Sequence, residues 1–365
     1  MRIWRRAAVG VLLMFCGFTA IHASEGSVQS VVLVTLDGLR TQELFGGLDM
    51  EVLKSSLKKD ARVEDTVSYA RYWASTPEER RLRLMPFFWG TLMKQFGFVY
   101  GNAALGSRVK VSNRHRFSYP GYSEILTGEA HDDVINSNDS RRNPYPSVLE
   151  FVKNKLGLSI NEVAAFASWE TINWIAQSHH GSVFINAGYD GYAHPQSLGA
   201  DISRQQFETL TAWGNERFDF YTFRLAMVHL ESYKPRFLYV SFGETDEWAH
   251  EKRYGLLLES LHQADERLRE LWNYLQHDEH YRGNTLLLIT TDHGRGNGPS
   301  DWHTHGADIE GAQNIWIALA NPKSSKRGEQ KEPPVLFQNQ IATTLCRFLG
   351  LDFSEQNSHA GSPIE

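Results

Sequence analysis

Short apolar runs alternate along the chain with stretches in which apolar residues return every three or four positions. Several runs have the length and the β-branched or aromatic content of buried strands: "SVVLVTLDGLR", "SRVKVSN", "NEVAAFAS", "SVFINAG", "RFLYVSFGETDEWAH", "NTLLLITTDHG" and "NIWIALA". The stretches between them are helical in pattern and include "YPSVLEFVKNKLG", residues 202–232 and "FQNQIATTLCRFLG". This alternation predicts an α/β fold whose central, mainly parallel sheet carries helices on both faces.

One helix is predicted with particular clarity. From Tyr254 onward, apolar residues alternate at spacings of four and three, which places them on one helix face: Leu257, Leu261, Ala264, Leu268, Leu271 and Leu275. Later, the charged, proline-bounded segment "PKSSKRGEQKEPP" is typical of a surface loop rather than of a domain linker. We therefore expect one domain rather than two.

The first residues have the pattern of a secretory signal peptide. The basic start "MRIWRR" precedes the apolar run "AAVGVLLMFCGFTA", and small residues follow in "IHASEG". The run is short for a membrane span, so an uncleaved anchor is the lesser alternative. We expect residues 1–23 to be removed, leaving a periplasmic or secreted domain of residues 24–365 without a membrane anchor.

Charge and cysteine content narrow the possible functions. The net charge is -6 at pH 7, and loss of Arg2, Arg5 and Arg6 with the signal would make it -9. An acidic protein has no general electrostatic reason to bind a nucleic-acid duplex. Of the two cysteines, Cys16 would leave with the signal, so an internal disulfide is excluded, and Cys346 is predicted to be a buried core thiol.

Three predicted strands end in carboxylates and imidazoles. The first is followed by Asp37, the second by Asp246 and His250, and the third by Asp292 and His293. In open α/β sheets ligands bind outside the carboxyl ends of the strands, so these side chains should converge. Carboxylates and imidazoles together are ligands for Zn²⁺ and similar ions. Singly, each has an ordinary interpretation as a turn former, a solvated pair or a loop residue.

Five segments in order resemble the alkaline phosphatase superfamily, and within it the branch of type I phosphodiesterases and nucleotide pyrophosphatases. They are "LVTLDG", "FSYPGYSEILTG", "GETDEWAH", "LLLITTDHG" and "HTHG", and they span residues 33–306. The resemblance implies an alkaline-phosphatase-like fold and an enzyme that hydrolyses phosphoric esters on small phosphorylated substrates.

The resemblance also implies two metal sites, which we take to hold Zn²⁺, with Mn²⁺ as the alternative. One ion would be bound by Asp37, Ser118, Asp292 and His293, and the other by Asp246, His250 and His305. We choose His305 of the two histidines in "HTHG" because the family's last ligand directly precedes a glycine; His303 is the reserve.

Ser118 is the implied nucleophile. In the family a Thr or Ser precedes an aromatic-Pro pair at a helix start, as Ser118 does in "RFSYPGYSEILTG". A divalent cation would favour the ionised hydroxyl, and the first amides of the helix would face the phosphate. The alternative is that Ser118 only caps the helix.

Asn138 is the implied contact to a non-bridging phosphate oxygen. Relatives place an asparagine after the "TG" segment, and an amide there would stabilise charge developing in the transition state. Spacing also permits Asn136, and an Asx turn is the structural alternative.

Two departures from the family leave the substrate open. Sulfatases require an arginine where Tyr122 stands, which argues against a formylglycine sulfatase. Familiar phosphodiesterases have Asn-His where this chain has Gly121-Tyr122. A sulfuryl, phosphonate or phosphoryl-transfer enzyme, or a metal-dependent binding protein, therefore remains an alternative, and the sequence does not indicate monoester or diester preference or the oligomeric state.

Overall fold

A computed structural model describes residues 28–193 and 197–364, so the predicted signal peptide lies outside the described part of the chain. A central eight-stranded sheet has the order β10-β2-β9-β7-β1-β6-β4-β5. Its strands are β1 (Ser30–Leu36), β2 (Gly97–Tyr100), β4 (Val163–Ala167), β5 (Phe184–Ala187), β6 (Phe237–Phe242), β7 (Thr285–Thr290), β9 (Ile317–Ala320) and β10 (Gly328–Glu329).

The middle of this sheet is parallel. Strand β1 pairs in parallel with β6 and β7, and β4 pairs in parallel with β6 and β5. Strand β9 runs antiparallel to both of its neighbours, β7 and β2. Three short strands, β3 (Val109–Lys110), β8 (Asn314–Ile315) and β11 (Leu336–Phe337), form a separate small sheet. The predicted fold class is confirmed.

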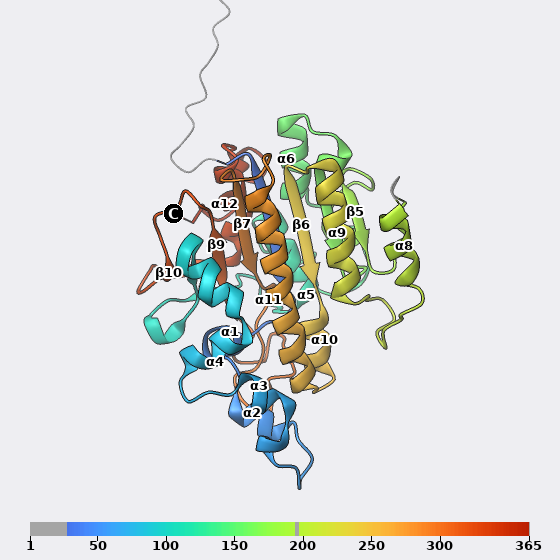
Figure 1. Cartoon of the computed structure of the whole chain (residues 1–365). Helices are drawn as coiled ribbons and strands as arrows, with labels where there is room; N and C mark the ends of the chain where they lie inside the picture. The colour runs from blue at the N-terminus through green and yellow to red at the C-terminus, as the bar shows by residue number, and fades with distance from the viewer. Residues whose placement is uncertain (1–27, 194–196, 365) are drawn as a thin grey trace, which may run out of the picture.

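Each face of the central sheet has its own hydrophobic core, because alternate residues of a strand point to opposite faces. The first core contains residues of α1 (Thr41–Gly46), α2 (Met50–Ser55), α3 (Val67–Tyr72), α4 (Pro77–Leu84), α8 (Ser197–Gln205), α9 (Asp219–Tyr233), α10 (Glu244–His250) and α11 (Tyr254–His277). The second contains residues of α5 (Ser118–Thr127), α6 (Val148–Leu156), α7 (Ile172–Ile175) and α12 (Ile341–Phe348). Figure 1 shows α9 and α11 in front of the sheet and α5 and α12 behind it.

Local chemistry explains several element boundaries. Helix α6 begins with a capping box between Ser147 and Glu150 and ends at Gly157, whose φ of 63° suits a glycine C-cap. Helix α11 runs from Tyr254 to His277 with the predicted apolar residues buried. Both predicted helices are confirmed.

Two predicted elements are wrong in extent. Residues 202–232 do not form one helix: α8 ends at Gln205, and an irregular segment precedes α9. The buried Trp213 and Arg217 of that segment are held by side-chain hydrogen bonds, so its burial does not require helical periodicity. The run "NIWIALA" is divided at Trp316 into β8 and β9, which belong to different sheets.

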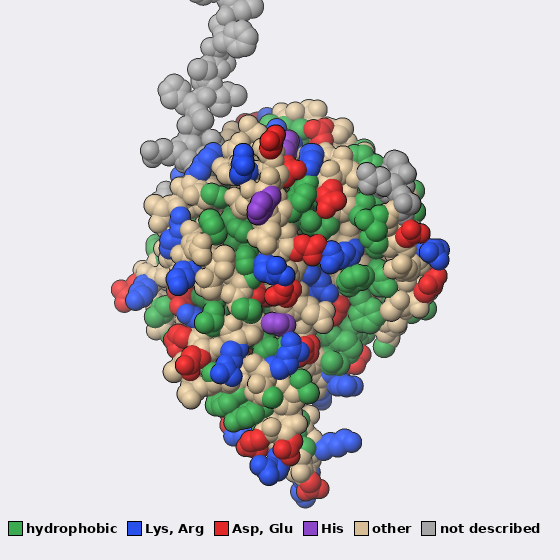
Figure 2. Space-filling model, in the orientation of Figure 1, with side chains coloured by type: hydrophobic (Ala, Val, Ile, Leu, Met, Phe, Trp, Pro, Cys, Tyr) green, Lys and Arg blue, Asp and Glu red, His purple; other side chains and the backbone are tan. Residues whose placement is uncertain are grey.

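The surface and the described cysteine complete the picture of the fold. Within residues 28–193 and 197–364, no helix is both long and apolar enough to cross a membrane. Figure 2 shows positive and negative side chains interspersed on one face of the molecule. Cys346 is a buried free thiol, as predicted.

Candidate active site

Three central strands deliver the predicted ligands to one edge of the sheet. In the parallel register Leu36 of β1 lies opposite Phe242 of β6, and Thr35 lies opposite Thr290 of β7. The three strands therefore end at nearly the same level. Asp37 follows β1, α10 follows β6, and Asp292 lies just beyond β7.

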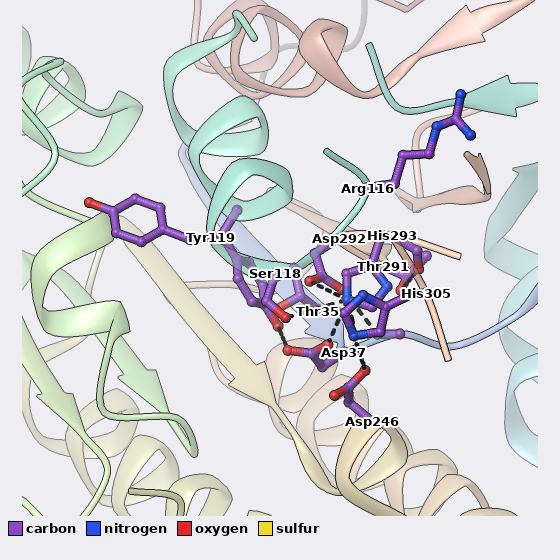
Figure 3. Close-up of polar contacts among 12 residues, drawn as sticks. Thr35, Asp37, Arg116, Ser118, Tyr119, Asp246, Thr291, Asp292, His293 and His305 are labelled. Atoms are coloured by element: carbon purple, nitrogen blue, oxygen red, sulfur yellow. Dashed lines mark hydrogen bonds and ion pairs between the residues drawn. The ribbon is translucent and has the colours of Figure 1, made fainter. Parts of the chain in front are cut away.

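The first set of side chains, here called the inner group, consists of Asp37, Asp292 and His293. One potential ligand atom from each lies within 4.8 Å of the others, and all three residues are buried. The Nε2 atom of His293 is 3.5 Å from Asp37 Oδ1 and 3.4 Å from Asp292 Oδ2 (Figure 3). The structure thus brings Asp37, near the start of the described chain, together with two residues that lie far along the sequence.

The second set, the outer group, consists of Asp246, His250 and His305. Their ligand atoms also lie within 4.8 Å of one another. His250 Nε2 is 3.0 Å from Asp246 Oδ2 and 3.0 Å from His305 Nε2. His303 is not part of this set, which favours His305 over its reserve.

The two groups adjoin each other. His293 Nε2 is 3.8 Å from Asp246 Oδ1, and the rings of His293 and His305 have centroids 4.0 Å apart. Figure 3 shows Asp37, Asp246, Asp292 and both imidazoles converging on one small volume. The side chains of Arg116 and Tyr119 point away from it (Figure 3).

Ser118 lies beside the inner group. It is the first residue of α5, and its Oγ is 3.3 Å from His293 Nε2. The N-cap residue is Phe117, and the helix has no side-chain cap, so the interpretation of Ser118 as a simple cap is wrong. Gly121 permits this position, because a Cβ there would lie 2.4 Å from the carbonyl oxygen of Asp292.

Asn138 lies beside the start of the same helix. Its Oδ1 accepts a hydrogen bond of 2.9 Å from the Tyr119 N–H, which is a long-range contact rather than an Asx turn. With the oxygen so engaged, the amide N–H groups are left for another acceptor. Asn136 and Asn138 are both exposed, and the Asn136 amide donates to the carbonyl oxygen of Asp133 at 3.5 Å. Asn138 contacts the backbone at the start of α5.

The inner group has the donor atoms that a divalent ion needs. Asp37 Oδ2 accepts a hydrogen bond of 2.8 Å from the Tyr122 hydroxyl, and Asp292 Oδ1 accepts one of 3.0 Å from the Gly38 N–H. The other oxygens, Asp37 Oδ1 and Asp292 Oδ2, are buried and have no hydrogen-bond partner. Buried, unpaired carboxylate oxygens are costly unless a cation compensates them. The residues therefore fit a bound metal ion.

Burial also shifts the titration of these groups. Burial, and next the neighbouring Asp292, raises the pKa of Asp37 to about 8, and burial raises the pKa of Asp292 to about 7. Burial lowers the pKa of His293 and, more strongly, that of His305. The imidazoles are thus held in the neutral form, which is the form that binds metals.

Sequence reasoning missed Arg295. Its side chain is 1% exposed; it forms an ion pair with Asp246 and donates a hydrogen bond of 2.8 Å to the carbonyl oxygen of His303. Burial lowers the pKa of its guanidinium to about 9. Because Arg295 stands between two glycines, its surroundings in the sequence resemble an exposed turn. Its position two residues after His293 is the one feature of the sequence that could have indicated a place near the site.

Solved structures of hydrolases and of a synthase share this fold. The lipoteichoic acid synthase LtaP from Listeria monocytogenes has a TM-score of 0.57 at 12% identity, over 91% of this chain and 74% of that one. A phosphonate monoester hydrolase from Silicibacter pomeroyi has a TM-score of 0.54 at 12% identity, over 92% and 76%. An alkaline phosphatase superfamily protein from Vibrio parahaemolyticus has a TM-score of 0.52 at 11% identity, over 90% and 68%. The fold is alkaline-phosphatase-like.

The sequence supplies the narrower assignment. Residues 61–321 match the type I phosphodiesterase / nucleotide pyrophosphatase family, and the chain belongs to that family. It is therefore an enzyme of the class that hydrolyses phosphoric esters, in a metal-dependent family, with two candidate groups of metal ligands. No curated protein matches the sequence.

Proposed function

We propose that this chain is an exported hydrolase of phosphate esters, with one domain over residues 24–365, that uses Ser118 as its nucleophile and two divalent ions. The observation that carries the proposal is the position of Ser118 Oγ, 3.3 Å from His293 Nε2, beside the unpartnered oxygens Asp37 Oδ1 and Asp292 Oδ2. The leader pattern of residues 1–23 supports export to the periplasm or beyond.

The inner group and Ser118 would hold one ion, and the outer group would hold the other. Zn²⁺ is the proposed metal because the ligands mix imidazole nitrogen with carboxylate oxygen; Mn²⁺ suits the same set. When bound, the ions would supply positive charge that neutralises the phosphate and favours the ionised hydroxyl of Ser118.

The chain's own groups would perform the remaining steps. Ser118 Oγ attacks phosphorus and displaces the ester oxygen, which leaves a phosphoseryl enzyme; water then cleaves the new Ser–phosphate bond. The Asn138 amide, fixed by the hydrogen bond from the Tyr119 N–H to its oxygen, would bind a non-bridging oxygen of the phosphate. The small phosphorylated substrate would enter at the partly exposed outer group, where the His250 side chain is 43% exposed.

Initial rates on matched nitrophenyl phosphate, phosphodiester and sulfate compounds test the proposal. We expect chelator-sensitive turnover of a phosphate ester, lost by about a thousandfold or more in Ser118→Ala, since removal of a nucleophile abolishes the covalent step. Ser123→Ala is the matched control, because this buried serine of the same helix contacts Asn143 instead.

Three results would count against the proposed function. Full activity in Ser118→Ala would refute the nucleophile, and faster turnover of the sulfate ester would favour the sulfuryl alternative. Zinc binding without turnover of any ester would favour a metal-dependent binding protein.

A further inference from the structure

Two buried strands carry hydroxyl side chains on the face that α5 covers. Thr35 of β1 lies opposite Ser241 of β6 in the parallel register, and Tyr239 lies two residues before Ser241, on the same face. The neighbouring positions on these strands are apolar, and all three hydroxyl residues are at most 2% exposed. Buried polar groups in an apolar strand need partners, so their partners indicate what they do.

These hydroxyls form one continuous chain that ends on a candidate metal ligand. Tyr122 Oη donates to Asp37 Oδ2 at 2.8 Å, and Ser241 Oγ donates to Tyr122 Oη at 3.3 Å. Thr35 Oγ1 donates to Ser241 Oγ at 3.0 Å. Thr35 Oγ1 and Tyr239 Oη are 3.2 Å apart.

Proton counting fixes the direction of the last bond. Each hydroxyl has one proton. The proton of Thr35 points to Ser241, so Tyr239 must be the donor to Thr35. All four O–H groups therefore point the same way, toward Asp37. Hydrogen bonds aligned in series polarise one another, which strengthens the final bond to the carboxylate.

We propose that Tyr239, Thr35, Ser241 and Tyr122 form a hydroxyl relay that positions Asp37 for metal binding. The relay occupies Oδ2 and so leaves Oδ1, the unpartnered oxygen, for the ion. Tyr122 is thus a positioning residue, and it has no direct contact with substrate in this role. The inference rests on the proposed function only in requiring that the inner group binds a divalent ion.

The relay also accounts for Gly121-Tyr122, the pair that departs from the family pattern. A Cβ at position 121 would lie 2.4 Å from the Asp292 carbonyl oxygen, so glycine allows α5 to lie directly against the inner group. Because α5 lies so close to the inner group, the Tyr122 hydroxyl can donate its hydrogen bond to Asp37. The pair Gly121-Tyr122 therefore packs its backbone against the Asp292 carbonyl group and places the Tyr122 hydroxyl on the Asp37 carboxylate.

The test is Zn²⁺ titration calorimetry on the full chain after its metals have been stripped. Tyr122→Phe keeps the ring and removes the hydroxyl; we expect one of two binding events to weaken about tenfold, as is usual when a partner of a metal ligand is lost, and the other to be unchanged. Tyr281→Phe is the matched control: Tyr281 is equally buried, and its hydroxyl donates to the carbonyl oxygen of Pro235 instead. That variant should retain both affinities.

A double variant separates a relay from a merely structural role. Ser241→Ala alone should weaken the same binding event by a smaller factor than Tyr122→Phe. Combined with Tyr122→Phe it should add nothing, because Ser241 acts on Asp37 only through Tyr122.

Unchanged Zn²⁺ affinity in Tyr122→Phe, or losses that add in the double variant, would overturn the relay. Wild-type protein that binds Zn²⁺ and responds to Tyr122→Phe but hydrolyses no phosphate ester would refute the proposed enzyme and leave the relay standing. Wild-type protein that takes up no Zn²⁺ would refute both.

Discussion

The inner and outer groups have similar ligand types but very different surroundings. Asp37, Asp292 and His293 are all buried, and each carboxylate of this group has one oxygen held by a hydrogen bond and one without a partner. In the outer group the His250 side chain is 43% exposed, and Asp246 is paired with the cationic Arg295.

This contrast indicates that the negative charge of the carboxylates is compensated differently in the two groups. The two carboxylates of the inner group carry negative charge that a bound cation or added protons must neutralise. In the outer group, the ion pair with Arg295 already neutralises the carboxylate of Asp246. We infer that the inner group holds its ion more tightly, and that the outer group exchanges its ion and admits substrate. Four experiments test this difference between the two groups.

The largest effect is expected at the inner group. Asp292→Asn keeps an acceptor for the Gly38 N–H but removes the negative charge that faces His293. We expect phosphate-ester turnover to fall by more than about a hundredfold, beyond the usual loss for a residue outside the ligand set. Steady-state rates measured over a range of Zn²⁺ concentrations check this, and recovery at high Zn²⁺ would contradict it.

Stripping the metals should make stability depend on pH. Burial raises the pKa values of Asp37 and Asp292 to about 8 and about 7, so these two carboxyls bind more protons in the folded than in the unfolded chain between about pH 4 and pH 8. His293 and His305, whose pKa values burial lowers, act in the opposite direction below about pH 6.5. The free energy of unfolding of the stripped protein should therefore fall as the pH rises from about 6.5 to about 8. Urea unfolding at several pH values measures it, and Zn²⁺ should remove most of the slope near pH 8. A stripped protein that gains stability as the pH rises would contradict the assignment.

Arg295→Met tests the charge compensation of the outer group. Removing one partner of a buried ion pair lowers the free energy of unfolding by about 3 kcal/mol, so the stripped variant should unfold at a lower urea concentration than the stripped wild-type protein. With Zn²⁺ bound, the ion replaces the guanidinium as the partner of Asp246, and the loss should be smaller. Arg217→Met is the control, because this buried arginine bonds to the neutral Asn186, Gln206 and Thr222 and its cost should not depend on Zn²⁺.

The smallest effect is expected at His250. Because this side chain is partly exposed, water can take its place as a ligand in His250→Ala. We expect about a tenfold loss of kcat/KM, restored in large part by excess Zn²⁺. A loss as deep and as irreversible as that of Asp292→Asn would show that the two groups are equivalent.

The fold and the convergence of these acids were predictable because polar residues interrupt apolar patterns at strand ends. Asp37, Asp246 and Asp292 each follow a short buried strand, and parallel strands must present such residues at one edge. The helix from Tyr254 was predictable because apolar residues that return every three or four positions over many turns form a continuous stripe only on a helix.

What could not be predicted depends on contacts between distant segments. The irregular stretch between α8 and α9 buries Arg217 through hydrogen bonds to Asn186 and Gln206, which no periodicity records. Arg295 looks like a surface residue until Asp246 is placed beside it. The direction of the hydroxyls in the relay requires the register of β1 against β6.

The pairing of β1 with β7 also has a kinetic consequence. Asp37 follows β1 and Asp292 follows β7, far apart in the sequence, so the chain must close a very long loop before the inner group exists. Ligands that meet only after this closure cannot attract an ion early in folding. Divalent ions should therefore prolong the lifetime of the native protein and leave the rate at which it folds unchanged.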